Sequence, residues 1–63
     1  MNVLEGLIQI RKEKKITQKK IAGHLNITQL TLGRYESKLR KIPFDLVEKY
    51  ADVLDYEIRL LKK

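Results

Sequence analysis

Three side chains between residues 28 and 37 have the types and spacing needed to bind the base edges of duplex DNA. Gln29, Leu30 and Arg34 would share the outward face of one helix, near its start. Gln can bind adenine and Arg can bind guanine through paired hydrogen bonds, and Leu can contact a thymine methyl group. Gly33 removes a side chain from the same face, which would let the helix lie closer to a groove. The alternative for Gln29, Leu30 and Arg34 is an ordinary solvated surface.

Polar and basic residues on both sides of this face are candidates for contacts with DNA phosphates. The candidates are Gln18, Lys19, Thr28, Lys38, Arg40 and Lys41. The first three lie at the starts of predicted helices, where exposed N–H groups attract anions. The last three form a basic loop after the predicted base-contacting helix. For this loop, a solvated run of charges is the alternative interpretation.

The residue types needed for catalysis or metal binding are scarce. The chain has no cysteine, and His24 is its only histidine, which excludes disulfides, thiolate sites and His-rich metal sites. The sequence contains no Ser/His/Asp set, paired-carboxylate motif or phosphate-binding glycine loop. We therefore expect no enzymatic activity, no metal and no cofactor, and we expect His24 to be an exposed helix residue.

Four amphipathic segments would position the candidate side chains. Apolar residues recur at helical spacing over residues 2–14, 17–25, 28–37 and 44–54. Asn2, Thr17 and Thr28 are suited to cap the first three of these helices. The second and third are short and joined by a tight turn, as in a helix-turn-helix, in which the second helix of the pair enters the major groove. The sequence therefore predicts an all-α fold, a small helical bundle with a helix-turn-helix.

After Asp55 the helical spacing gives way to alternation. Tyr56, Ile58 and Leu60 alternate with other side chains over residues 56–61, which predicts a short strand. No second strand is visible in the sequence, so the simplest partner is the same strand of a second copy, antiparallel across a two-fold axis. We therefore expect a homodimer with contacts through these three residues. The alternative is a fifth short helix or a frayed tail.

Size and charge narrow the class of protein. The 63 residues have a formal net charge of +6, and this length predicts a single domain. With the helix-turn-helix pattern, the whole of residues 1–63 is predicted to be one helix-turn-helix DNA-binding domain. Ten bases and three acids lie in residues 1–41, against four bases and five acids in residues 42–63. This imbalance favours a polyanion-binding face, with a solubilising surface as the alternative. No apolar run approaches about 18 residues and no signal peptide is visible, which predicts a cytoplasmic protein without a membrane span.

Several residues around the turn match a known pattern at its spacing. They are Gln18, Ala22, Ile27, Thr28, Leu32, Arg34, Tyr35 and Glu36. On these residues the chain resembles, over about residues 4–54, the lambda-repressor-like family of Cro, phage-repressor and xenobiotic-response-element regulators. The resemblance implies base contacts at Gln29, Leu30 and Arg34 and a phosphate contact at Gln18. It also implies that the loop after the third helix lies along the DNA backbone.

The resemblance also bears on residues outside the base-contacting face. It implies a partly buried ion pair between Arg11 and Glu36 with an orienting role, because Arg11 lies on the apolar stripe of the first helix. A phosphate contact by Arg11 is the alternative. Lys38 and Asp55 stand where the family usually has glycine. Because lysine rarely adopts a left-handed backbone, the geometry of the exit from the third helix is open at this stage.

These observations predict a sequence-specific, double-stranded DNA-binding transcriptional regulator. We expect a repressor that binds an inverted-repeat operator as a dimer, with half-sites one helical turn or a multiple apart. One alternative is an antitoxin or controller-type protein whose main partner is another protein, such as a toxin, with DNA binding for autoregulation. Another is a non-specific binder of nucleic acid or anionic membranes, which the charge alone would allow.

Overall fold

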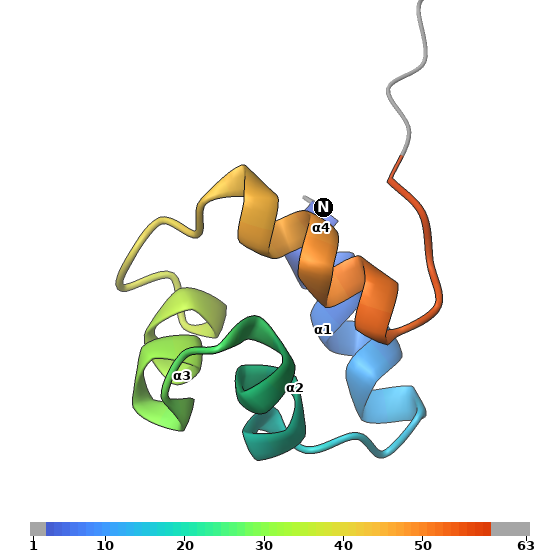
Figure 1. Cartoon of the computed structure of the whole chain (residues 1–63), viewed down its shortest axis with the longest axis horizontal. Coiled ribbons are helices and arrows are strands. Elements are labelled where there is room, and N and C mark those ends of the chain that lie inside the picture. Colours follow the sequence, from blue (N-terminus) through green and yellow to red (C-terminus); the bar gives the residue numbers. More distant parts are fainter. Residues whose placement is uncertain (1–2, 59–63) are drawn as a thin grey trace, which may run out of the picture.

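Four helices form a bundle in residues 3–58, the part of the chain that this computed structural model describes (Figure 1). They are α1 (Val3–Glu13), α2 (Gln18–Leu25), α3 (Gln29–Glu36) and α4 (Phe44–Val53). Each end lies within one residue of its predicted position, so the predicted all-α helix-turn-helix bundle is confirmed. The predicted cap Asn2 lies outside the described residues.

Threonine side chains begin the two helices of the helix-turn-helix. Thr17 accepts a hydrogen bond from the Lys20 N–H at 3.1 Å and precedes α2. Thr28 accepts one from the Thr31 N–H, also at 3.1 Å, and precedes α3. Each hydroxyl satisfies a helix-end N–H that has no carbonyl partner within the helix, so these two residues fix where α2 and α3 begin.

All four helices end through a residue with left-handed backbone geometry, and none of these residues is glycine. The φ angles are 59° at Lys15, 60° at Asn26, 68° at Lys38 and 67° at Asp55. After each left-handed residue, the next N–H bonds back to a carbonyl five residues earlier, as from Leu39 to Arg34 at 2.9 Å. This is the Schellman arrangement. Lys38 therefore keeps the helix exit that glycine usually provides, which resolves the question left open by the sequence.

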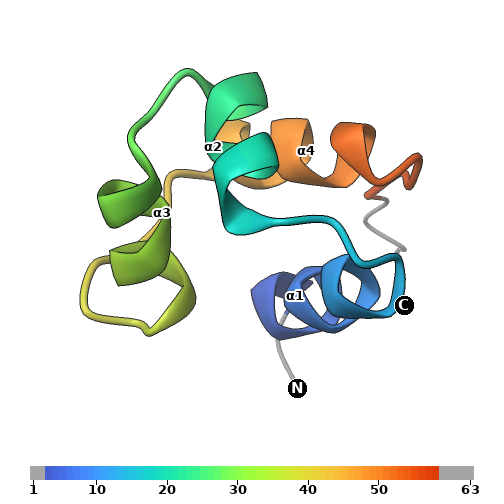
Figure 2. The same cartoon turned by 90° about the horizontal axis from the view of Figure 1, so that it is seen from below.

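The core lies where α2 packs against both α3 and α4, and α1 packs against α3 and α4. In both views α3 lies at one end of the bundle (Figures 1 and 2). The fully buried side chains of largest volume are Tyr50, Ile21, Leu32 and Leu54. Since apolar side chains from every helix meet here, burial of this cluster holds the two helices of the helix-turn-helix in place.

The C-terminal segment packs back on the bundle as far as it is described. Tyr56 donates its N–H to the Ala51 carbonyl at 2.9 Å, and the Lys14 ammonium lies 6.0 Å from the centre of its ring. Ile58 packs against the core. Residues 56–58 of this single chain form no strand, and Leu60 lies outside the described residues. Strand pairing between two copies therefore stays a prediction.

None of the helices in residues 3–58 has the length and apolar character needed to cross a membrane.

Candidate nucleic-acid interface

The exposed side of α3 carries a hollow of about 540 Å³, which we call the α3 hollow. Its lining residues are Gln18, Gln29, Leu30, Gly33, Arg34, Ser37 and Leu39. Gln18 is the first residue of α2 and lies beside the last residue of α3, where its Nε2 donates to Glu36 Oε1 at 3.0 Å, so it joins the exposed face of α3. The structure thus brings together all four predicted base-contacting residues and one predicted phosphate contact.

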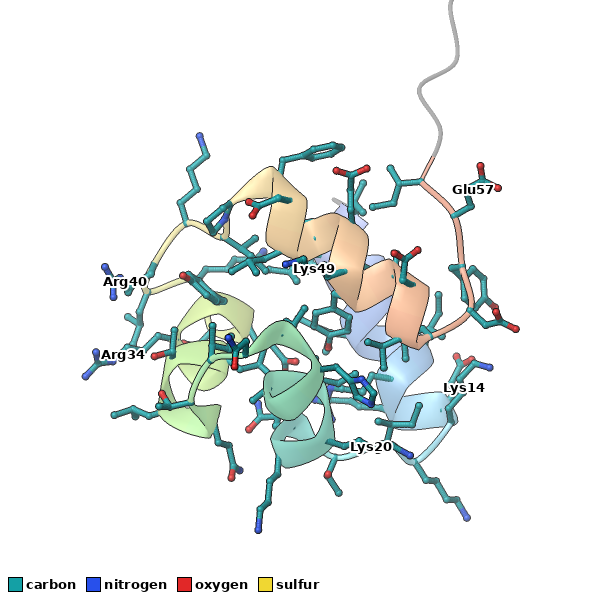
Figure 3. All side chains as sticks on the ribbon, in the orientation of Figure 1. Lys14, Lys20, Arg34, Arg40, Lys49 and Glu57 are labelled. Carbon is teal, nitrogen blue, oxygen red and sulfur yellow. The ribbon has the colours of Figure 1, made fainter. Side chains whose placement is uncertain are left out.

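The side chains of the α3 hollow are accessible to a large partner. Leu30 is 66% exposed and Leu39 is 78% exposed, whereas the leucines of the core are at most 9% exposed. Arg34 and Arg40 both project outward on the α3 side of the molecule (Figure 3). A Cβ atom placed on Gly33 would meet no described atom within 4 Å, so the glycine is not required by packing inside the protein.

A hydrogen-bonded network under the α3 hollow ties its helix to α1 and α4. Arg11 Nη2 lies 2.9 Å from Glu36 Oε1 and Arg11 Nε lies 3.2 Å from Glu36 Oε2, a two-pronged ion pair with both side chains less than one tenth exposed. The Tyr50 hydroxyl donates to Glu36 Oε2 at 2.6 Å and accepts from Arg11 Nε at 3.0 Å. Arg11 Nη1 also donates to the Ile16 carbonyl at 2.9 Å.

The network perturbs the ionisation of two of its members. Burial raises the pKa of Tyr50 well above its ordinary value, and the hydrogen bond to Glu36 and the charge of Glu36 raise it further. Burial alone would lower the pKa of Arg11, but its hydrogen bond and ion pair with Glu36 outweigh desolvation, so the pKa is raised. Tyr50 therefore stays protonated and donates a hydrogen bond, and Arg11 stays charged, throughout the physiological pH range.

The charge around the α3 hollow is positive because its one nearby acid is neutralised. Glu36 is the only acidic residue between Glu13 and Asp45, a stretch that holds eight Lys and Arg residues. Its carboxylate is buried and paired with Arg11. No exposed carboxylate of α2 or α3 therefore opposes the approach of a phosphate backbone.

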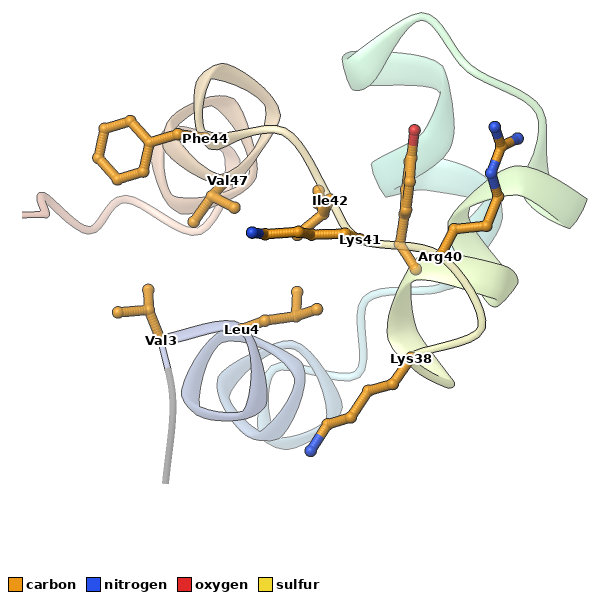
Figure 4. A pocket seen from close by; sticks show the side chains of 9 residues that line it. Val3, Leu4, Lys38, Arg40, Lys41, Ile42, Phe44 and Val47 are labelled. Carbon is orange, nitrogen blue, oxygen red and sulfur yellow. The ribbon is translucent and has the colours of Figure 1, made fainter.

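The basic loop after α3 borders a second feature, an apolar groove of about 510 Å³. Val3, Leu4, Ile42, Phe44 and Val47 line it, together with Tyr35 and the three loop bases (Figure 4). Lys41 extends across the space between the α1 side and the α4 side of the groove (Figure 4). Lys38 forms an ion pair with Glu5, which ties the loop to α1.

The predicted phosphate contacts therefore lie in four places. Gln18 lines the α3 hollow, and the loop bases Lys38, Arg40 and Lys41 surround the groove beside it. Lys19 lies with Lys20 and His24 along a separate exposed hollow of α2, and His24 is exposed as predicted. Thr28 caps α3, and its hydroxyl also lies 2.9 Å from the Thr31 hydroxyl.

Sequence reasoning missed two residues of the α3 hollow, Ser37 and Leu39. The Ser37 hydroxyl donates to the Arg34 carbonyl at 3.3 Å, in the last turn of α3. Leu39 follows the left-handed Lys38 and is turned outward by the Schellman exit. An apolar residue between two bases, Lys38 and Arg40, was the signal in the sequence that could have drawn attention to it.

Residues 3–58 contain no group of three or more His, Asp or Glu side chains placed to hold a metal ion.

The model of a helix-turn-helix family matches residues 7–61, most of the chain. No curated protein matches the chain. No solved structure matches it either. The family match covers α4 and also α2, α3 and the basic loop, the three elements that form the α3 hollow. The chain therefore belongs to the lambda-repressor-like helix-turn-helix family of DNA-binding transcription regulators.

Proposed function

We propose that this protein is a sequence-specific repressor that binds an inverted-repeat operator as a homodimer. The observation that carries the proposal is the α3 hollow, where Gln29, Leu30, Gly33 and Arg34 share one exposed face without an opposing carboxylate. A surface of this size and chemistry suits the major groove of B-DNA, which accepts one α-helix and presents distinct donors, acceptors and methyl groups.

Each residue of the face has a distinct role in this proposal. Arg34 binds guanine, Gln29 binds adenine and Leu30 contacts a thymine methyl group. Gly33 lets the helix backbone approach the floor of the groove. Gln18 binds a phosphate on one side and fixes the register of α3 on the duplex, because phosphate contacts position a protein without selecting sequence.

The remaining contacts come from bases outside the α3 hollow. Lys19 lies on α2, before α3 in the sequence, and the other three bases lie on the loop after α3: Lys38, Arg40 and Lys41. Four charged phosphate contacts in each of two subunits predict that the logarithm of affinity falls with the logarithm of salt concentration with a slope of about −7. Repression follows because a dimer of this kind occludes the promoter that it covers.

The experiment is selection of bound duplexes from a random pool at near-physiological salt, followed by sequencing. We expect enrichment of an inverted repeat with half-site centres separated by about 10–10.5 base pairs or a multiple of that. A single enriched half-site would retain the role of α3 and refute the dimer. Enrichment of no sequence would refute specific recognition, and a protein that copurifies with the chain would then support the antitoxin-type alternative.

A further inference from the structure

The carboxylate of Glu36, at the end of α3, has every acceptor position filled. Oε1 accepts from Arg11 Nη2 at 2.9 Å and from Gln18 Nε2 at 3.0 Å. Oε2 accepts from the Tyr50 hydroxyl at 2.6 Å and from Arg11 Nε at 3.2 Å. A carboxylate offers about four lone-pair sites, so the four donors saturate it and fix its plane.

This saturation dictates how the Gln18 side chain is oriented. An ionised carboxylate only accepts hydrogen bonds, so the Gln18 amide must turn its nitrogen, and not its oxygen, toward Glu36. One N–H of Nε2 is used in this contact. Gln18 is only half-buried and also lines the α3 hollow, so the rest of its amide faces the surface that α3 exposes.

We propose that Glu36 and Tyr50 are positioning residues for Gln18, which they hold with its second Nε2 N–H available to donate to a DNA phosphate. The inference rests on the proposed function, since it assigns the donor atom and the support of one of its contacts. A glutamine free to rotate could also present its amide oxygen to the phosphate, and two acceptors repel. Anchoring by Glu36 removes that orientation before DNA binds, which lowers the entropy lost on binding.

Tyr50 is the member of the network that can be tested without removing a charge. Its ring is fully buried in α4, and its hydroxyl contributes the shortest contact to Glu36. Tyr50→Phe keeps the ring and leaves the Arg11–Glu36 ion pair in place. The substitution removes the shortest hydrogen bond to Glu36 Oε2, so the carboxylate is held by Arg11 and its contact with the Gln18 amide loosens.

The first test is a double-mutant cycle on the selected operator, with Gln18→Ala, Tyr50→Phe and the double variant. We expect Gln18→Ala to weaken binding by about tenfold on every duplex with an unchanged salt slope, because the lost contact carries no charge. We expect Tyr50→Phe to weaken binding by about threefold to tenfold, and to have no effect once Gln18 is alanine. Equal effects of Tyr50→Phe in both backgrounds would overturn the proposal.

The matched control is Ile21→Val, which removes one methyl group from a fully buried side chain on the same helix as Gln18. Ile21 lies outside the network, so this variant reports what a loosened core does to DNA affinity. We expect it to lower thermal stability while leaving operator affinity unchanged. If Ile21→Val weakened binding as much as Tyr50→Phe, the effect of the hydroxyl would be merely structural and the proposal would fail.

The second test needs no DNA, so its failure is distinguishable from failure of the proposed function. The side-chain amide of Gln18 is followed by ¹⁵N NMR and assigned through Gln18→Ala. We expect two well-separated proton shifts, one of them displaced by the carboxylate, and a collapse toward exposed-glutamine values in Tyr50→Phe. Exposed-glutamine shifts in the unmodified protein would refute the anchoring of Gln18 whether or not the protein binds an operator.

Discussion

Replacing Gly33 with alanine separates the stability of α3 from its fit to DNA. Gly33 has ordinary helical backbone geometry, and an added Cβ would meet no described atom within 4 Å. Alanine is favoured over glycine inside a helix by about 0.5–1 kcal/mol, so the variant is expected to be more stable. For a domain of this size, that gain raises the midpoint of thermal unfolding by roughly 2–8 °C.

The same methyl group is expected to weaken DNA binding. It would project into the α3 hollow between Leu30 and Arg34, the space that the proposal assigns to the approach of a base pair. Inserting a methyl group into a well-packed contact costs about 1–3 kcal/mol, which corresponds to a loss of affinity of roughly fivefold to 150-fold per half-site. Circular dichroism melts measure the first effect, and fluorescence anisotropy with a labelled operator measures the second.

The matched control is Gly6→Ala in α1. Gly6 is also helical, an added Cβ there also meets nothing within 4 Å, and it does not line the α3 hollow. We expect the same gain in stability with no change in affinity. A Gly33→Ala variant that is stabilised but binds the operator as tightly as the unmodified protein would refute close approach of α3 to the groove at this position. A destabilised variant would refute the helical geometry described for it.

Four further outcomes follow from the structure. Arg34→Ala is expected to lower operator affinity by about 1–3 kcal/mol and to relax selectivity at one base pair, as measured by repeating the duplex selection, whereas equal weakening on every duplex would assign Arg34 to a phosphate. Arg11→Ala leaves the buried Glu36 carboxylate without its counter-ion and is expected to lower the free energy of unfolding by about 3–5 kcal/mol in urea titrations. Because the pKa of Tyr50 is raised in the folded state, the unfolded chain loses this proton first. Stability should therefore be insensitive to Tyr50 below about pH 10 and fall above it by up to ~1.4 kcal/mol per pH unit, a decline that Tyr50→Phe should lack. Lys15→Gly is expected to raise stability by about 1 kcal/mol in the same titrations, since glycine adopts the left-handed backbone without strain; no gain would show that the lysine is unstrained there.

The helices could be predicted from the sequence because local signals agree with the packing. Thr17 and Thr28 cap α2 and α3, as the sequence predicted, and Pro43 directly precedes α4. The apolar positions of α1, α2 and α4 recur at helical spacing, and the same positions form the core. The segment after Asp55 was harder to predict because alternation over a few residues does not show whether a partner strand exists.

The site could be predicted only in part, because its geometry depends on contacts between distant residues. Helical spacing alone placed Gln29, Leu30 and Arg34 on one face. The participation of Tyr50 in the Glu36 network could not be predicted, since Tyr50 also fits the apolar stripe of α4 and only the folded structure places its hydroxyl 2.6 Å from the carboxylate. Leu39 was missed because its outward direction results from the left-handed backbone of Lys38, a conformation that lysine rarely adopts.

Two of the left-handed residues at the helix ends affect the stability of the domain without belonging to the surface proposed to bind DNA. Lys15 and Asp55 lie outside the α3 hollow, and each holds a backbone conformation that glycine adopts at lower free energy. In a marginally stable domain, a change of about 1 kcal/mol alters the unfolded fraction roughly fivefold, and with it the rate of proteolytic turnover. Substitutions at these positions can therefore change the cellular abundance of the regulator while every side chain proposed to contact bases is retained. Dosage and target sequence can thus evolve as separate traits in this chain.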